Sequence, residues 1–245
     1  MVIVPLGSTE QHGMHLPLNV DTFCAEYMAK LAAEKASARA QNFSFLVAPA
    51  LSYTYVAVHK MFPGTVGIKL VTLVRVLTDI LESFLEQGFM NLVLFTGHAE
   101  NVCPMEAAFQ IVAERRPKAR LTGLSSLTLG SKVRAGACKA GTAGLGHALE
   151  AETSMTMVLQ PELVHIDRVT KGARNLPLSE RFIGATGFDK SKGVIYYNGL
   201  TGFEATGIQG DPSLAGREEG KQLLAAITDD FADILLEVVG AEKQN

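Results

Sequence analysis

The sequence predicts an α/β protein with a mostly parallel sheet that is covered by helices on both faces. Short apolar segments alternate along the chain with longer amphipathic ones, as in proteins whose strands are connected through helices. The apolar segments are continuous runs, which is typical of strands buried on both faces. The chain has 245 residues, without an internal repeat or a low-complexity linker, so we expect residues 1–245 to form one domain.

The expected elements follow one another in a regular order. We expect strands at 1–6, 45–48, 91–95 and 119–124, and helices at 22–36, 72–87, 104–114 and 148–159. A last helix with an apolar stripe is expected to start at Gly210-Asp-Pro-Ser, with Asp211 or Ser213 as its cap. Residues 129–146 are rich in glycine, alanine and lysine and show neither period, so no element is expected there.

The segment 168–208 is long, punctuated by glycine and only weakly periodic. Segments of this length inside a compact domain usually belong to a site or an interface. Its aromatic and acidic residues are expected to cover the pocket or to pack against a neighbouring subunit. These residues are Tyr196, Tyr197, Phe203 and Glu204.

Polar side chains gather directly after the first expected strand. Glu10, His12, His15 and Asp21 lie within a dozen positions of one another. Open α/β sheets bind ligands just beyond the carboxyl ends of their strands, and carboxylate with imidazole suits zinc and manganese. The alternative is that Asp21 only caps the helix that follows and that Glu10 and His12 are solvated loop residues.

A second stretch repeats this arrangement. The strand 91–95 runs into Gly97, and His98 and Glu100 follow two residues apart. Two such strand ends face one crevice in a parallel sheet, and with Asp21 as a bridging carboxylate they supply enough ligands for two metal ions. Two ions at about 3.5–4 Å generate a hydroxide nucleophile and polarise a scissile carbonyl. The alternative is that His98 is a core histidine and Gly97 merely a turn.

Two further segments contain histidines that suit a pocket. If His147 lies at or before the start of its helix, it and Glu152 can both point to the crevice, and a neutral imidazole there can pass a proton to a leaving nitrogen. The alternative is that Glu150 and Glu152 merely favour the helix N-terminus. In the loop 52–65, His59 and Tyr53 either line the pocket or lie on the surface.

Five motifs together resemble the creatininase (creatinine amidohydrolase) family. They are GSTEQHGMHLPLNVD at 7–21, FPGT at 62–65, GHAEN at 97–101, HALEAETS at 147–154 and GDPSLAG at 210–216. The resemblance implies a three-layer α/β/α sandwich that assembles as a homo-oligomer, a hexamer in the family. It also implies two divalent ions per chain, zinc or manganese, and hydrolysis of a C–N bond in a cyclic amide or formamide-type small molecule.

The resemblance also implies roles for individual residues. Glu10, Asp21 and His98 would hold one ion, and His12, Asp21 and Glu100 the other, with Asp21 as the bridge. His147 would move the proton to the leaving nitrogen, and Glu152 would be a supporting carboxylate of the site.

The chain departs from creatininase in substrate recognition. Creatininase encloses its flat ring with tryptophans in the segment before the His147 motif, whereas this chain contains no tryptophan and reads GACKAGTAGLG at 136–146. We therefore expect metal chemistry with a substrate other than creatinine. The alternatives are a formamide of a nucleotide-pathway intermediate, a small peptide, a cyclic ketone, or a catalytically inert metal-binding subunit whose crevice serves assembly.

Composition excludes other classes of function. A formal net charge of −3 offers no basic surface for nucleic acid or anionic membranes. No apolar run reaches the roughly 18–20 residues that span a bilayer, and the first residues read as a strand rather than a targeting peptide. The three cysteines have no close pair spacing and are expected to be buried thiols, which fits a reducing cytoplasm.

Overall fold

A parallel four-stranded sheet forms the centre of the protein. The computed structural model describes residues 1–40, 43–172 and 206–242. Strand β1 (Val2–Leu6) lies between β2 (Leu46–Val47) and β3 (Asn91–Thr96), and β4 (Arg120–Ser125) pairs with the far side of β3. Both β1 and β3 are buried along their whole length, which confirms the prediction of parallel strands covered on both faces.

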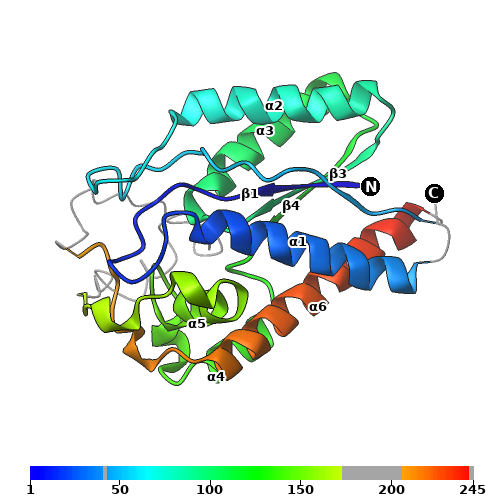
Figure 1. Ribbon diagram of the computed structural model, residues 1–245. Helices are drawn as coiled ribbons and strands as arrows, with labels where there is room; N and C mark the ends of the chain where they lie inside the picture. Colours follow the sequence, from blue (N-terminus) through cyan, green and yellow to red (C-terminus); the bar gives the residue numbers. More distant parts are fainter. Residues whose placement is uncertain (41–42, 173–205, 243–245) are drawn as a thin grey trace, which may run out of the picture.

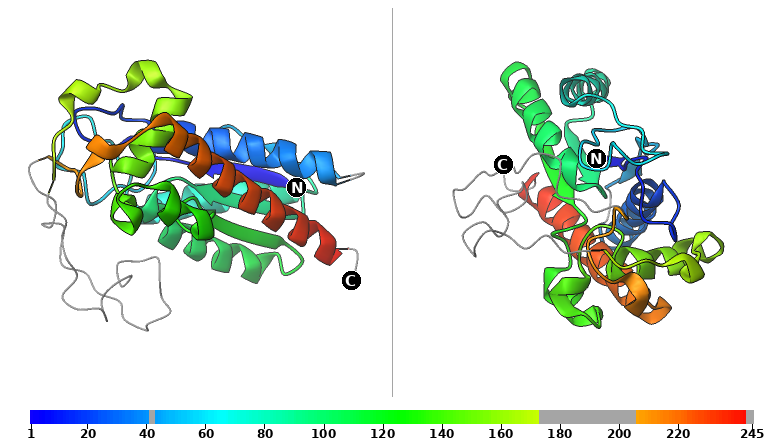
Figure 2. Two further views of the ribbon diagram at one scale, coloured as in Figure 1. Left: turned by 90° about the horizontal axis from the view of Figure 1, so that it is seen from below. Right: turned by 90° about the vertical axis from the view of Figure 1, so that its left-hand side faces the viewer.

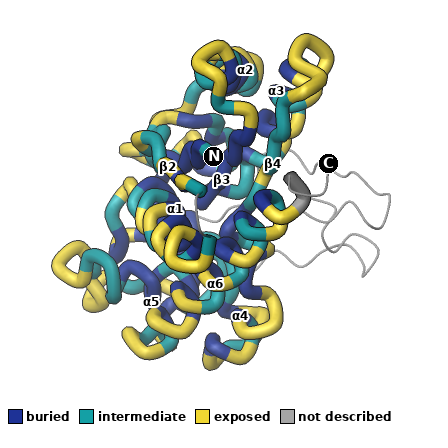
Figure 3. The backbone as a smooth tube through the Cα atoms, turned by 90° about the vertical axis from the view of Figure 1, so that its right-hand side faces the viewer, coloured by how far each residue is buried: buried dark blue, intermediate teal, exposed yellow. Residues whose placement is uncertain are grey.

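Helices cover the two faces of the sheet in separate layers (Figures 1 and 3). On one face lie α2 (Leu70–Glu86) and α3 (Val102–Arg115). Leu73 and Leu77 of α2 and Met105 of α3 belong to one buried cluster with Leu92 and Leu94 of β3. On the other lie α1 (Val20–Arg39) and α6 (Arg217–Glu242). The predicted three-layer α/β/α sandwich is confirmed.

Two shorter helices extend the second layer. Helices α4 (Ser131–Ala137) and α5 (Glu150–Leu159) pack against α6 (Figure 2). The contact between α5 and α6 is close because Gly220 has no side chain, and a Cβ there would lie 2.1 Å from the carbonyl oxygen of Ser154. Short 3₁₀ helices lie at Ala99–Asn101, Gly141–Gly144, Pro161–Leu163, Ile166–Arg168 and Pro212–Leu214.

Some local expectations were wrong. Residues 129–146 contain α4, which periodicity does not reveal because tertiary contacts hold it: the amide of Gly130 donates to Asp230 of α6 at 2.8 Å. The last helix begins at Arg217 and not at Gly210, since Asp211 caps only the 3₁₀ turn by accepting from the amide of Ser213. Strand β2 is only two residues long.

The other expected features stand as follows. Tyr196, Tyr197, Phe203 and Glu204 lie outside the described residues. All three cysteines are free; Cys24 and Cys138 are buried but Cys103 is exposed, so the expectation of burial was wrong for Cys103. Among the described helices, none combines the length and apolar character that crossing a bilayer requires.

All four strands end on the same side of the molecule, because the sheet is parallel. The loop 7–19 that leaves β1, the loop 52–65 and the segment that leaves β3 therefore meet at this edge, at the left of Figure 1. The polar residues singled out in the sequence lie here.

Candidate metal centre

Asp21 lies in the first turn of α1, beside the loop that leaves β1. The N-cap is Asn19, so the alternative in which Asp21 only caps this helix is wrong. The loop runs against the helix because Gly7 has no side chain, and a Cβ there would lie 2.3 Å from the Cα of Thr22. Ser8 donates a hydrogen bond to Asp21 Oδ2 at 2.6 Å, which fixes the orientation of the carboxylate.

The Asp21 carboxylate lies between two imidazoles. Its Oδ2 is 3.2 Å from His98 Nδ1, and its Oδ1 is 3.4 Å from His12 Nε2. Glu10 Oε2 lies 2.9 Å from the same nitrogen of His98. These four side chains are buried. A carboxylate that presents one oxygen to each of two ligand groups is suited to bridge two cations.

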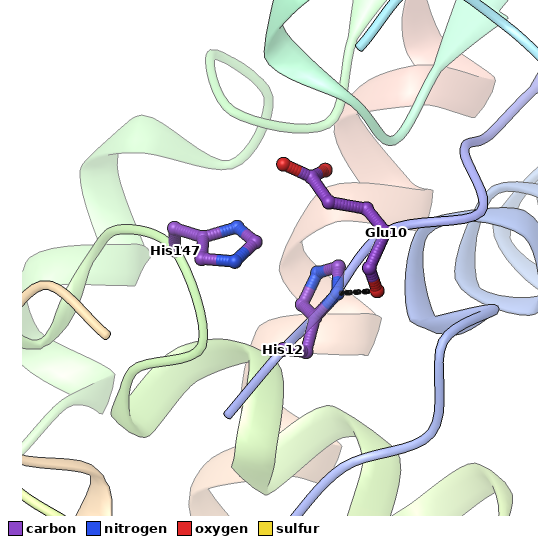
Figure 4. A group of neighbouring side chains, drawn as sticks. All are labelled: Glu10, His12 and His147. Carbon is purple, nitrogen blue, oxygen red and sulfur yellow. Dashed lines mark hydrogen bonds between the residues drawn. The ribbon is translucent and has the colours of Figure 1, made fainter. Parts of the chain in front are cut away.

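The outward ring nitrogens of both imidazoles are bonded to backbone carbonyls. His98 Nε2 lies 3.1 Å from the carbonyl oxygen of Tyr55, and His12 Nδ1 lies 2.9 Å from that of Glu10 (Figure 4). Metal-binding histidines are usually oriented in this way. The remaining nitrogen of His12, Nε2, is buried without a hydrogen-bond partner. A buried orphan nitrogen that faces carboxylates fits a metal ligand.

Two further carboxylates reach the cluster from opposite sides. Glu152 Oε2 lies 3.7 Å from His12 Nε2, and these two residues form a potential metal-binding group with Asp21. Glu100 Oε2 lies 3.7 Å from His98 Nε2 and groups with Glu10 and His98. The structure therefore brings together the five expected metal ligands and Glu152, but it places Glu152, rather than Glu100, beside His12 and Asp21.

The charges of the cluster stabilise one another. Burial alone would lower the pKa of His12, but Asp21 and Glu152 outweigh it and raise the pKa to about 10. Burial likewise opposes the charge of His98, whose pKa is nevertheless raised by Glu10 and Asp21. Burial would raise the pKa values of Glu10 and Asp21, yet the adjacent imidazoles hold both well below the usual range. Carboxylates that stabilise two buried positive charges in this way would also stabilise a bound divalent cation.

His147 precedes α5, which begins at Glu150. The sequence analysis required this position if His147 and Glu152 were both to point to the crevice. The chain turns at Ala148, which has a φ of 54°, and its amide donates to Glu152 Oε2 at 2.6 Å. His147 Nε2 lies 2.7 Å from the carbonyl oxygen of Gln11. Glu152 thus supports the turn that carries His147, whereas a backbone carbonyl orients the imidazole. Burial and the charge of His12 lower the pKa of His147 to about 3, and burial raises that of Glu152 to about 7.

His59 belongs to the site, a point that the sequence left open. It is buried, bonds through Nδ1 to the carboxylate of Glu10, and stacks on His147 with ring centroids 3.8 Å apart. Tyr53, by contrast, is 58% exposed. In the sequence, the only sign that His59 lines the pocket was its position just before the FPGT turn. His15 is buried against Thr153 and lies outside the candidate metal groups among the described residues.

Residues 1–235 match the model of the Creatininase family, described as creatinine amidohydrolase. The chain belongs to the creatininase family. It is therefore a hydrolase of this family, and the resemblance of its five motifs is confirmed over nearly the whole chain.

Individual proteins are also similar to this chain over much of its length. The mycofactocin precursor peptide peptidase of Mycobacterium ulcerans is 32% identical over 237 residues, which cover 94% of this chain and 82% of that protein. The creatinine amidohydrolase of Pseudomonas putida is 29% identical over 183 residues, or 69% and 68% of the two chains. A solved creatininase structure with manganese superposes with a TM-score of 0.79 at 25% identity, covering 97% of this chain and 90% of that one.

Proposed function

We propose that this creatininase-family hydrolase is a binuclear metal-dependent amidohydrolase that cleaves a C–N bond of a small molecule. The observation that carries the proposal is the position of Asp21, whose two carboxylate oxygens face the ring nitrogens of His98 and His12. The Nε2 of His12 supports it, because this nitrogen is buried without a hydrogen bond and faces the carboxylates of Asp21 and Glu152 at 3.4 and 3.7 Å, as a metal ligand would.

The ligand groups divide into two halves around Asp21. Glu10 and His98 would complete one site, and His12 belongs to the other. The third ligand of the second site is Glu152 by its position beside His12 and Asp21, or Glu100 by its place in the GHAEN motif. Zinc or manganese suits this set of carboxylates and imidazoles.

Each part of the site would have a defined task in hydrolysis. Two divalent ions supply an activated water at neutral pH and polarise the carbonyl of the substrate. His147 is the proposed proton carrier to the leaving nitrogen, since its imidazole lies 4.3 Å from that of His12 and its lowered pKa favours the neutral form. Glu152 holds the Ala148 turn and so positions His147.

A small peptide is the second candidate substrate. The relative in Mycobacterium ulcerans is named a precursor peptide peptidase and matches 94% of this chain. The absence of tryptophan removes the large aromatic surfaces that would enclose a planar ring. Both candidates require the same attack on a C–N bond, and they differ only in the groups around it.

The wider setting of the enzyme follows from the same proposal. We expect residues 1–245 to form one domain, the chain to act in the cytoplasm, and several copies to assemble into a homo-oligomer. Met14, Met61 and Val66 are exposed apolar side chains on the loops around the site, and they are suited to such an interface or to the substrate. The mass of the particle in solution, measured by light scattering, tests the assembly.

Elemental analysis of protein purified without chelator tests the metal centre. We expect close to two zinc or manganese ions per chain in the wild type and loss of metal in Asp21→Ala. Asp79→Ala is the matched control, because Asp79 is an exposed carboxylate on α2, and it should keep both ions. A wild-type protein without stoichiometric metal, even after incubation with zinc or manganese, would contradict the proposal.

A further inference from the structure

His15 is a buried histidine without a task in the proposed hydrolysis. It lies three residues after His12 in the loop 7–19, and its side chain is fully buried. The chain turns at Gly13, which has a φ of 73°, and a Cβ there would lie 2.7 Å from His15 Nδ1. Glycine at this position lets the imidazole fold back against the loop, whereas Met14, between the two histidines, is exposed.

His15 joins this loop to the helix that carries Glu152. Its Nε2 lies 3.0 Å from Thr153 Oγ1 near the start of α5, and Thr153 is fully buried as well. The carbonyl oxygen of His15 accepts a hydrogen bond from the amide of His165 at 2.9 Å, in the segment that follows α5. The loop is therefore attached at one residue to the chain on both sides of this helix.

Packing alone does not explain a histidine at this position. The Nδ1 atom of His15 is buried without a hydrogen-bond partner among the described residues, and an unsatisfied buried nitrogen is costly. A leucine would fill a similar space without this cost. What the imidazole adds over an apolar side chain is the contact between its Nε2 and the hydroxyl of Thr153.

The position of α5 decides whether Glu152 reaches the proposed second ion. Glu152 Oε2 lies 3.7 Å from His12 Nε2, and the two residues form a potential metal-binding group with Asp21. His12 lies on the loop, whereas Glu152 lies on the helix, one residue before Thr153. A shift of the helix relative to the loop would therefore move the Glu152 carboxylate away from the other members of the group.

We propose that His15 is a positioning residue for the second metal ion, because its hydrogen bond to Thr153 holds Glu152 within reach of that ion. The inference rests on the proposed binuclear function, and it takes Glu152 as the third ligand of the second site. It goes beyond that function by assigning a role to a residue outside the candidate metal groups of the described chain. The first ion, on the side of His98, should not depend on this contact.

Paired variants at Thr153 test the proposal without changing a histidine. Thr153→Val replaces the hydroxyl with a methyl group, and Thr153→Ser keeps the hydroxyl. Competition of the zinc-loaded protein with chelators of graded affinity measures the two ions separately. We expect Thr153→Val to lose about tenfold in affinity for one ion only, as for loss of a partner that orients a metal ligand. Thr153→Ser should bind both ions as the wild type does.

Variants at His15 assign the effect to the pair. His15→Leu should lose affinity for the same ion, whereas His15→Gln, whose amide nitrogen can take the place of Nε2, should recover most of it. The double variant His15→Leu/Thr153→Val should lose no more than either single variant, since both remove one interaction. Thr78→Val is the control and should keep both ions, because Thr78 is a buried threonine of α2 whose hydroxyl donates within its own helix.

The route through Glu152 is tested in a variant of that residue. Because the contact acts through the Glu152 carboxylate, Thr153→Val should cause no further loss of metal affinity when it is added to Glu152→Gln. A further loss in this background would contradict the proposal. If His15→Leu does not fold, the variants at Thr153 decide the question.

Specific results would overturn the inference. Unchanged affinity for both ions in Thr153→Val, or equal loss of both ions, would leave His15 as a packing residue. Losses that add up in the double variant would show that His15 and Thr153 act independently. A wild type with two ions whose variants keep both rejects only this inference, whereas a wild type without metal rejects the proposed function.

Discussion

His59 and His147 stack with ring centroids 3.8 Å apart and 20° between the ring planes. One comes from the loop before the FPGT turn and the other from the turn before α5. The same His59 ring bonds to Glu10, so it connects a proposed metal ligand with the proposed proton carrier. It is a positioning residue in this arrangement.

Substitution of His59 should therefore lower kcat more than it raises KM. His59→Phe keeps an aromatic ring against His147 but loses the bond to Glu10, whereas His59→Ala loses both. We expect the alanine variant to be the slower of the two, with metal content near that of the wild type in both. Steady-state kinetics with metal analysis checks this; equal kcat in the two variants would show that the stacking has no role.

Replacing His147 with alanine should abolish turnover and leave the metal content intact. Loss of a general acid–base group costs about 10²–10⁴-fold in rate. His147 lies beside Glu10 and His12 and forms with them a third group that could hold an ion (Figure 4). Its Nε2 bonds instead to the carbonyl oxygen of Gln11, and the proposal gives it the proton and no ion. Turnover close to that of the wild type would rule out the proton-carrier role.

The third ligand of the second site can be identified with two isosteric variants. Glu152→Gln should lower the metal content towards one ion per chain, because Glu152 lies with His12 and Asp21. Glu100→Gln is the matched comparison, because Glu100 is the other candidate for the third ligand. The carboxylate of Glu100 also accepts hydrogen bonds from the backbone amides of Ala57 and Val58 at 2.9 and 3.2 Å. If only the Glu100 variant loses the second ion, the assignment from the GHAEN motif is correct instead.

Ser8→Ala should weaken metal binding without removing a ligand. The Ser8 hydroxyl donates to Asp21 Oδ2 at 2.6 Å, and the loss of such an orienting hydrogen bond typically costs about 10–100-fold in metal affinity. Competition with a chelator of known affinity measures the change. Ser83→Ala, at an exposed hydroxyl on α2, is the control; equal affinities in the two variants would contradict the orienting role.

Phe231→Ala should destabilise the fold by about 3–5 kcal/mol, as expected for truncating a buried phenylalanine. The ring of Phe231 is fully buried on α6 and lies 4.5 Å from that of Phe95 on β3, between the sheet and its helix layer. Denaturant unfolding measures the loss. A change below about 1 kcal/mol would mean that neighbouring side chains of this layer move into the space that the ring leaves.

The sequence allowed the main features of the fold to be predicted because they depend on local patterns. Continuous apolar runs such as 91–95 indicate buried parallel strands, and these are confirmed. Helix α4 escaped prediction because Gly130 and the residues after it are held by α6 rather than by their own periodicity. Burial of Cys103 was also predicted wrongly.

The sequence by itself determined which chemical groups stand at the ends of β1 and β3, because strand ends, glycine breaks and residue types are local properties. These groups include Glu10, His12 and His98. Only the tertiary structure decided that Glu152 meets His12 and that His59 stacks on His147. Each of these contacts joins segments far apart in the chain, and their distances depend on strand order and helix packing, which no local pattern contains.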